Sequence, residues 1–296
     1  MSSGFDVIQG TSGRGAASCP ASTTARAWRS DRGQNDPVTS SFFVPQGISD
    51  HGREVFSTQP SAAGPWSPTS QHGSPPAALL ARAVERLDTG SERVLGRITV
   101  ELLGPVPVGD LSVEAHVVRP GRNVELCEAT LYDEERGRAV ARAAAWRFPS
   151  GVEGPRPETE PPPHRPHEGE EQDAPVYWSP GYVQAMEWRW VKGAVAEPGP
   201  AVVWMRPRVA LVEGEETTPL QALMTCVDSA SGASSELDPA RWGFQNPELT
   251  VHVLRPPSAP GSAWTPRPPW AAAAWGSRPP RCTTSRGSWR GRRRRC

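Results

Sequence analysis

The sequence lacks the features that mark a membrane-spanning or secreted chain. No apolar run approaches the roughly 20 residues that a membrane-spanning helix requires. Met1–Gly10 has neither the charged start nor the apolar stretch of a secretory signal. The few cysteines are odd in number, lie far apart and form no Cys-x-x-Cys pair: Cys19, Cys127, Cys226, Cys282 and Cys296. We therefore expect a cytoplasmic protein with reduced thiols and with no metal or redox cofactor.

Lysine is almost absent, and acidic residues stop early. Lys192 is the only lysine among 32 basic residues, and no acidic residue follows Glu248. Ten arginines lie between Arg255 and Arg295, which leaves 22 basic against 32 acidic residues in the preceding chain. The net charge of zero thus combines an acidic body, near −10, with a purely basic tail.

Residues 39–149 predict one compact α+β unit. Apolar residues at helical spacing predict a helix over Pro75–Leu87, with prolines in its first turn and Gly90 after its end. A strand is expected to begin near Phe42–Val44. Alternating apolar and polar residues predict four more strands after the helix: Val94–Leu103, Leu111–Val118, Asn123–Tyr132 and Ala139–Phe148. A helix followed by an antiparallel meander is an α+β arrangement.

The flanking segments have other compositions. Residues 1–38 are rich in Ser, Thr, Gly, Ala and Arg and are expected to be disordered. Residues 150–175 alternate proline with acidic residues, which predicts an extended linker with solvated His164 and His167. Residues 176–257 predict a second unit with one helix and three strands: Thr218–Val227, Val183–Val191, Ala201–Val209 and Glu248–Leu254. Trp188, Trp190 and Trp204 are expected in its core.

The two units resemble each other. Ile98–Pro105 aligns with Leu249–Pro256, and each block follows a helix that opens beside a proline, Pro76 or Pro219. A helix-then-strand unit that recurs across a proline-rich linker indicates tandem duplication.

Residues 258–296 break this pattern. Three more strands should follow, but the chain instead carries arginine, proline and scattered tryptophan. One interpretation is a tail that binds nucleic acid through phosphate neutralisation and base stacking. The favoured one is a reading-frame shift near Ser258–Ser262, because plausible codons for Arg281–Cys296 in another frame restore a segment similar to Leu131–Ala145. The truncated second unit predicts poor solubility.

The duplicated unit resembles the double hotdog arrangement of the acyl-CoA thioesterase II family, in particular its actinobacterial thioesterase-like members. The matching segments lie within residues 40–257, with the linker unmatched: Gly64–Pro68, Gln71–Leu80, Val100–Val106, Val227–Ser229, Leu237–Pro239 and Asn246–Pro257. The resemblance implies two curved antiparallel sheets, each around a central helix and joined edge to edge, with the second copy incomplete. It also implies an acyl-CoA or other acyl thioester as substrate, and association into homo-oligomers is common among such proteins.

The resemblance further implies the catalytic groups. The family uses an aspartate on the second-unit helix, a hydroxyl-bearing residue before the next strand and a glutamine on the last strand. Asp228 matches the aspartate, whereas the hydroxyl position aligns either with Asn246 or with the nearby Thr250. The glutamine falls in the aberrant tail. His72 is a candidate to contact substrate, and Gly73, just before the first helix, is expected to let a substrate approach the backbone. The expected function is thioester hydrolysis by water activation, with an inactive acyl-thioester binder as the alternative.

Overall fold

The computed structural model describes residues 5–6, 41–151, 164–175, 178–195, 197–238, 242, 245–253, 257 and 262–264. Most of the expected disordered extension, residues 1–38, and of the aberrant tail, residues 258–296, lies outside these ranges, as does the first half of the expected linker.

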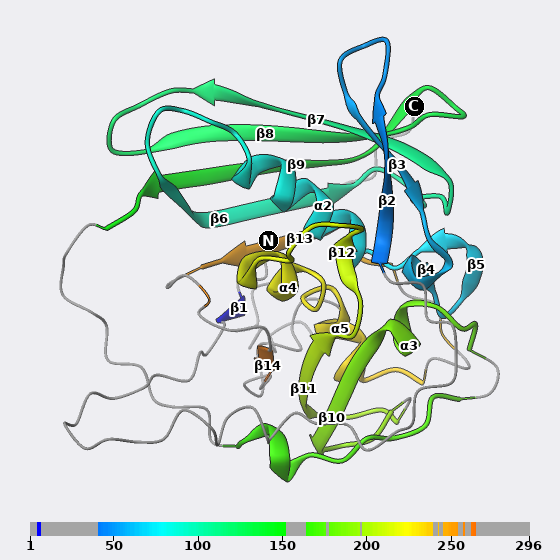
Figure 1. The fold of residues 1–296 in the computed structure, drawn as a ribbon. Helices are drawn as coiled ribbons and strands as arrows, with labels where there is room; N and C mark the ends of the chain where they lie inside the picture. Colours follow the sequence, from blue (N-terminus) through cyan, green and yellow to red (C-terminus); the bar gives the residue numbers. More distant parts are fainter. Residues whose placement is uncertain are drawn as a thin grey trace, which may run out of the picture.

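A nine-stranded sheet forms one side of the molecule (Figure 1). Its strand order is β1-β13-β6-β9-β8-β7-β3-β2-β12. Neighbours are antiparallel except at the two outer edges, where β1 pairs with β13 and β12 with β2 in parallel. Its strands are β1 Phe5–Asp6, β2 Ser41–Ile48, β3 Glu54–Thr58, β6 Arg93–Leu102, β7 Asp110–Arg119, β8 Glu125–Asp133, β9 Arg138–Pro149, β12 Ala210–Val212 and β13 Glu248–His252.

The central helix α2, Ser74–Glu85, lies against this sheet (Figure 1). Every residue from Ser74 to Val84 is buried. Alternation along the strands supplies the covering face, since Cys127, Ala129 and Leu131 of β8 are buried while their neighbours are more exposed. The helix is buried all round because β6–β9 cover one side and α4, Pro219–Met224, packs on another.

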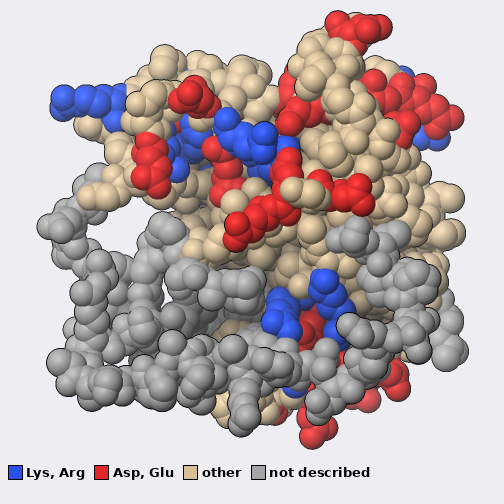
Figure 2. Space-filling view, in the orientation of Figure 1, with Lys and Arg blue, Asp and Glu red and all other residues tan. Residues whose placement is uncertain are grey.

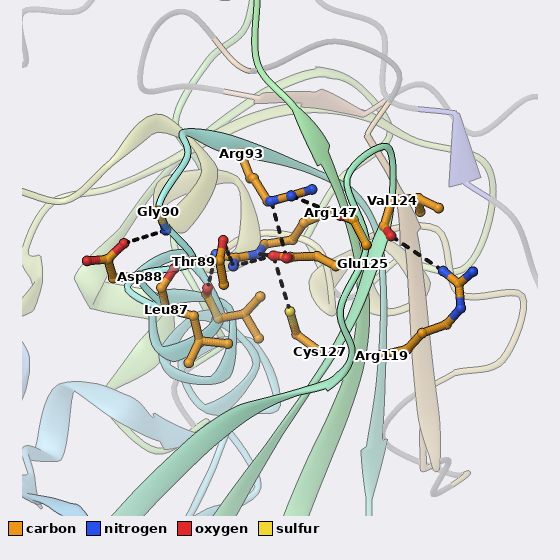
Figure 3. A network of polar contacts seen from close by, with 12 residues as sticks. Leu87, Asp88, Thr89, Gly90, Arg93, Arg119, Val124, Glu125, Cys127 and Arg147 are labelled. Carbon is orange, nitrogen blue, oxygen red and sulfur yellow. Dashed lines mark hydrogen bonds and ion pairs between the residues drawn. The ribbon is translucent and has the colours of Figure 1, made fainter.

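A buried ion-pair network fixes the C-terminal end of α2 (Figure 3). Arg147 of β9 donates from Nη1 to the carbonyl oxygens of Val84 and Leu87, at 2.9 and 3.0 Å. Its Nε donates to Glu125 of β8 at 2.7 Å, and Arg93 of β6 lies 3.2 Å from the same carboxylate. One guanidinium thus adds hydrogen bonds to carbonyl oxygens at the end of the helix, where few further backbone donors follow.

The second unit packs below α2 in Figure 1. It contains a three-stranded sheet in the order β10-β11-β14 and short helices. Their bounds are α3 Tyr182–Ala185, β10 Met186–Lys192, β11 Val202–Pro207, α4 Pro219–Met224, α5 Ser229–Ala233 and β14 Ser262–Trp264. Trp190 and Trp204 are buried there, as expected, whereas Trp188 is only partly buried and packs against the core.

The units join through β6 and β13, the two strands that contain the aligned blocks. Thr99 of β6 pairs directly with Thr250 of β13, its own counterpart in the alignment. Ile98 pairs with Val251, and Val100 pairs with Leu249. The antiparallel pairing is therefore centred on equivalent residues of the two blocks.

The structure corrects several expected boundaries. The predicted strand Val183–Val191 begins as the helix α3, because Val183–Ala185 turn before the chain extends at Met186. The predicted helix Thr218–Val227 ends at Met224, where the Thr225 hydroxyl donates to the carbonyl oxygen of Ala222 at 2.7 Å. Strands β3, β12 and the short β4 Ala63–Gly64 and β5 Ser67–Gln71, with the 3-10 helix η1 Pro60–Ala62, were not predicted.

The described part of the expected linker is attached rather than free. Residues 164–175 include the 3-10 helix η2, Pro166–Glu168, and a bridge that pairs Glu170 with Trp190 of β10. Gln172 accepts from the Val195 amide at 2.7 Å. Backbone pairing along β10 therefore orders a segment whose composition alone favours solvated chain.

Candidate functional site

His72 lies at the entrance to α2. It follows β5, and its backbone N–H donates to the carbonyl oxygen of Ala62 at 2.9 Å. The imidazole Nδ1 accepts from the Ser74 amide at 3.2 Å, which places the ring proton of the neutral form on Nε2. Burial lowers the pKa of His72, and the nearby Asp228 carboxylate offsets only part of that effect. His72 is therefore a neutral, buried imidazole.

Asp228 reaches the same place from the second unit. The chain turns after α4, and Asp228 stands immediately before α5. Its backbone N–H donates to the Ser74 hydroxyl at 3.2 Å. This contact joins the first turn of α2 to the loop that carries the carboxylate, so the early end of α4 is what brings Asp228 to α2.

The Asp228 carboxylate has a polar group beside each oxygen. Oδ1 accepts from Asn246 Nδ2 at 3.0 Å, and Oδ2 lies 3.5 Å from His72 Nδ1. Asn246 also donates to the Ser231 hydroxyl at 2.9 Å, which fixes the orientation of its amide. The side chains of Asp228 and His72 are each 9% exposed. The carboxylate stands at the N-terminal end of a twelve-residue helix, whose dipole favours negative charge there.

Gly73 lies against the Asp228 carboxylate. A Cβ added at Gly73 would lie 2.7 Å from Asp228 Oδ2 and 3.2 Å from Leu102 Cδ1. The absence of a side chain at Gly73 therefore lets the carboxylate pack beside the start of α2. A substrate contact at Gly73 stays a prediction.

Tyr182 is a member of this site that the sequence analysis missed. Its ring stacks on His72 with centroids 3.8 Å apart and planes 5° from parallel. Its hydroxyl donates to the carbonyl oxygen of Thr225 and lies 2.7 Å from the Ser229 hydroxyl. Burial raises the pKa of Tyr182 well above its ordinary value, so the phenol stays protonated and holds the loop around Asp228. The signal in sequence was weak, because one tyrosine after a glycine is a common loop feature.

Trp66 borders the site on the solvent side. Its ring centroid is 5.6 Å from that of His72, and 66% of the residue is exposed. An indole exposed beside a buried imidazole and carboxylate is an apolar surface on which a ligand can rest. Its neighbour Pro65 accepts from the Ser179 amide at 2.9 Å, so the second unit also braces this loop.

The structure separates the two candidates for the hydroxyl position. Asn246 contacts Asp228, whereas the Thr250 hydroxyl lies 3.1 Å from that of Thr99 and donates to Glu248 at 3.1 Å. Thr250 is a buried residue of the join between β6 and β13. The side chain that accompanies Asp228 is thus an amide rather than a hydroxyl.

The cysteines of the described chain are not poised as nucleophiles. Cys226 and Cys127 are both buried, and burial raises the pKa of Cys226 to about 12 and also raises the pKa of Cys127. A thiol must ionise to attack a carbonyl group. Neither thiol is therefore suited to attack a thioester.

The described residues contain neither a metal-binding cluster nor a membrane-spanning helix. No three His, Cys, Asp or Glu side chains among them gather as a metal site would require. Within the same ranges, no helix has the length and apolar character needed to cross a membrane.

Two family models match the chain. The acyl-CoA thioesterase N-terminal domain matches residues 62–148, and the acyl-CoA thioesterase C-terminal domain matches residues 157–277. Together they cover most of the chain. The second match begins at residue 157 and so includes most of the linker that was expected to be unmatched, and it extends to residue 277, within the expected aberrant tail. No match was found among curated proteins.

Solved structures share the fold. A protein assigned as a thioesterase from Novosphingobium aromaticivorans is 15% identical over 75% of this chain and 84% of its own, with a TM-score of 0.57. A hot dog fold protein of unknown function from Alicyclobacillus acidocaldarius is 19% identical over 71% and 76% of the two chains, with a TM-score of 0.50. A protein assigned as a thioesterase II from Thermobifida fusca is 19% identical over 76% and 84%, also with a TM-score of 0.50. The predicted double hotdog fold is confirmed.

Proposed function

The chain belongs to the acyl-CoA thioesterase family, and from this premise we propose that it hydrolyses acyl thioesters, acyl-CoA among them, with Asp228 as the group that activates water. The observation that carries the proposal is the Asp228 carboxylate. It is almost buried at the start of α2, between Asn246 and a neutral His72. A carboxylate held in one position by neighbouring polar groups can serve as a general base that accepts a proton from water.

The reaction needs one base and one proton donor. Asp228 takes a proton from water as the oxygen adds to the thioester carbonyl carbon. The tetrahedral intermediate then collapses, the C–S bond breaks, and the proton held by Asp228 passes to the departing thiolate. The products are a carboxylic acid and a free thiol, and the Asp228 carboxylate is restored.

His72 and Asn246 position the carboxylate. Asn246 donates to Oδ1 and holds the group in one orientation. His72 lies beside the other oxygen, with its Nδ1 3.5 Å from Oδ2. The imidazole is itself held in place, because Nδ1 accepts from the Ser74 amide and the ring stacks on Tyr182.

Asp228→Asn tests the assignment. The amide keeps the shape of the side chain but cannot accept a proton from water, so the turnover number should fall by about 100-fold or more, the usual contribution of a general base. The measurement is thiol release from a medium-chain acyl-CoA, with Asp110→Asn at the exposed first residue of β7 as the matched control. Turnover by Asp228→Asn at the wild-type rate would contradict the role of Asp228. Tight acyl-CoA binding without any turnover by the wild type would instead favour the inactive binder.

A further inference from the structure

The duplication gives the candidate site a counterpart elsewhere in the molecule. The alignment of Pro76 with Pro219 continues without a gap to match Val84-Glu85 with Val227-Asp228. Read backwards from the prolines, the same alignment matches His72 with Glu215 and Gly73 with Glu216. Glu85 is therefore the first-unit equivalent of Asp228.

Glu85 and Asp228 each reach the other unit. Asp228 follows the helical segment of the second unit; its backbone N–H donates to Ser74 at the start of α2, and its carboxylate lies 3.5 Å from His72. Glu85 ends α2 and contacts residues at the start of α4, accepting from the Thr218 hydroxyl at 3.1 Å and from Gln221 Nε2 at 2.9 Å. Each unit thus delivers one carboxylate to the other unit.

A cavity accompanies the Glu85 carboxylate. Its volume is about 530 Å³, and its lining residues are Glu85, Arg86, Glu215, Glu216, Thr218 and Gln221. Three of these, Glu85, Glu215 and Glu216, are the counterparts of Asp228, His72 and Gly73. The cavity is therefore the duplicated image of the candidate site, and its volume falls in the range of small-molecule pockets.

The image has the same kind of base but a different charge. Three carboxylates and one guanidinium line it. Acidic side chains, drawn in red, are also frequent across the upper half of the face that Figure 2 shows. Arg82 binds Glu215 through two hydrogen bonds of 2.7 Å, and Arg86 lies 3.5 Å from the same carboxylate. Within the described part of the chain, neither arginine forms an ion pair with Glu85 or Glu216, so these two carboxylates give the lining its acidic character. This lining repels a polyanionic carrier such as coenzyme A and admits a neutral or cationic one.

We propose that this cavity is a second hydrolytic centre, in which Glu85 activates water against acyl thioesters whose carrier is uncharged or cationic. The inference rests on the proposed function of the Asp228 site, because it transfers the same chemistry to the duplicated position. Glu85 takes the proton of the attacking water, the C–S bond breaks, and the proton passes to the thiolate. Thr218 and Gln221 orient the carboxylate as Asn246 orients Asp228.

The test compares two thioesters of one acyl chain: octanoyl-CoA, and octanoyl-N-acetylcysteamine, which has no phosphates. Wild type, Asp228→Asn, Glu85→Gln and the double variant are assayed for thiol release. Asp228→Asn should lose about 100-fold on octanoyl-CoA yet keep at least a tenth of its rate on the neutral thioester. Adding Glu85→Gln should reduce that remaining rate by about 100-fold, whereas adding the exposed Glu135→Gln should leave it unchanged.

Two further measurements separate a catalytic role of Glu85 from a purely structural one. Burial raises the pKa of Glu85, so the remaining activity of Asp228→Asn should fall on acidification with an apparent pKa above that of an ordinary glutamate. Glu85→Asp in the same background should recover part of the rate, and thermal melting reports whether each variant folds. A lower melting temperature with an unchanged rate in Glu85→Gln would overturn the proposal.

The outcomes also separate this proposal from the proposed function. If Asp228→Asn abolishes hydrolysis of both thioesters while the wild type cleaves octanoyl-CoA, the second centre is wrong and the Asp228 site stands. If the wild type cleaves neither thioester, both proposals fail.

Discussion

At the scale of single residues, the site depends on one missing side chain. Gly73 has ordinary helical dihedral angles, so no unusual backbone conformation demands glycine. The requirement comes from the Asp228 carboxylate, which occupies the volume where a Cβ would be. A glycine just before a helix can therefore mark a packing contact with a residue that is distant in sequence.

Gly73→Ala should damage catalysis more than folding. The new methyl group would lie 2.7 Å from Asp228 Oδ2, so the carboxylate must move away from His72 and Asn246. We expect the turnover number with acyl-CoA to fall by about tenfold to 100-fold, because displacement of a reacting group by about 1 Å has effects of this size. Steady-state kinetics and thermal melting measure the two effects. Gly104→Ala is the control, since nothing lies within 4 Å of its added Cβ, and equal kinetics in both variants would contradict the role of Gly73.

At the scale of elements, the position of α2 determines where the site forms. Its N-terminal end carries His72 and Ser74 to Asp228, and its C-terminal end is held by Arg147 and Glu125 (Figure 3). Arg147 is 3% exposed and Glu125 is 1% exposed. The network is thus a buried ion pair that also caps the helix.

Arg147→Met should destabilise the fold strongly. It leaves Glu125 in the core with Arg93 as its remaining described ion-pair partner, and it removes both hydrogen bonds from Nη1 to the carbonyl oxygens of Val84 and Leu87. Breaking a buried pair from one side costs about 3 kcal/mol or more in the free energy of unfolding. Denaturant titration measures this, with Arg138→Met, an exposed residue of the same strand, as the control. The double variant Glu125→Gln/Arg147→Met should recover part of the loss; a single-variant loss below about 0.5 kcal/mol would argue against the network.

At the scale of the whole molecule, Arg82 ties the units together. Its side chain is 2% exposed and binds Glu54 of β3 and Glu215 of the second unit at 2.9 and 2.7 Å. Burial opposes the charge of Arg82, but the hydrogen bonds to Glu215 and Glu54 prevail and raise its pKa. The hydrogen bond from Arg82 in turn lowers the pKa of Glu215.

Arg82→Met should lower the melting temperature in a pH-dependent way. The folded pKa of Glu215 lies below its unfolded value, so the stabilisation is fully present above the ordinary pKa of about 4.3 and is lost as the pH falls through the folded value. The difference between wild type and variant should therefore be largest near neutral pH and narrow on acidification towards pH 3. The control is Arg86→Met, which removes a half-exposed guanidinium 3.5 Å from Glu215. A pH-independent difference would contradict this account.

Much of the fold followed from local pattern. Apolar spacing predicted α2 to within two residues at its end, because a helix buried against a sheet needs that spacing. The alternation of apolar and polar residues predicted β6, β7, β8 and β9 to within about two residues, because alternate side chains of these strands are buried against α2. The short β3, β5 and β12 escaped prediction, since tertiary pairing rather than propensity stabilises strands of this length.

The sequence by itself determined the elements around α2 and indicated a repeated unit, because periodicity and repetition are local properties of the chain. The candidate residues Asp228, Asn246 and Thr250 came from the family resemblance, which matches short segments of the sequence. Only the tertiary structure decided which of them meet. It joined Asn246 to Asp228, assigned Thr250 to the β6–β13 pair, placed Tyr182 on His72 and brought Glu85 to its cavity. These contacts link residues far apart in sequence, and such contacts depend on how the two units pack against each other.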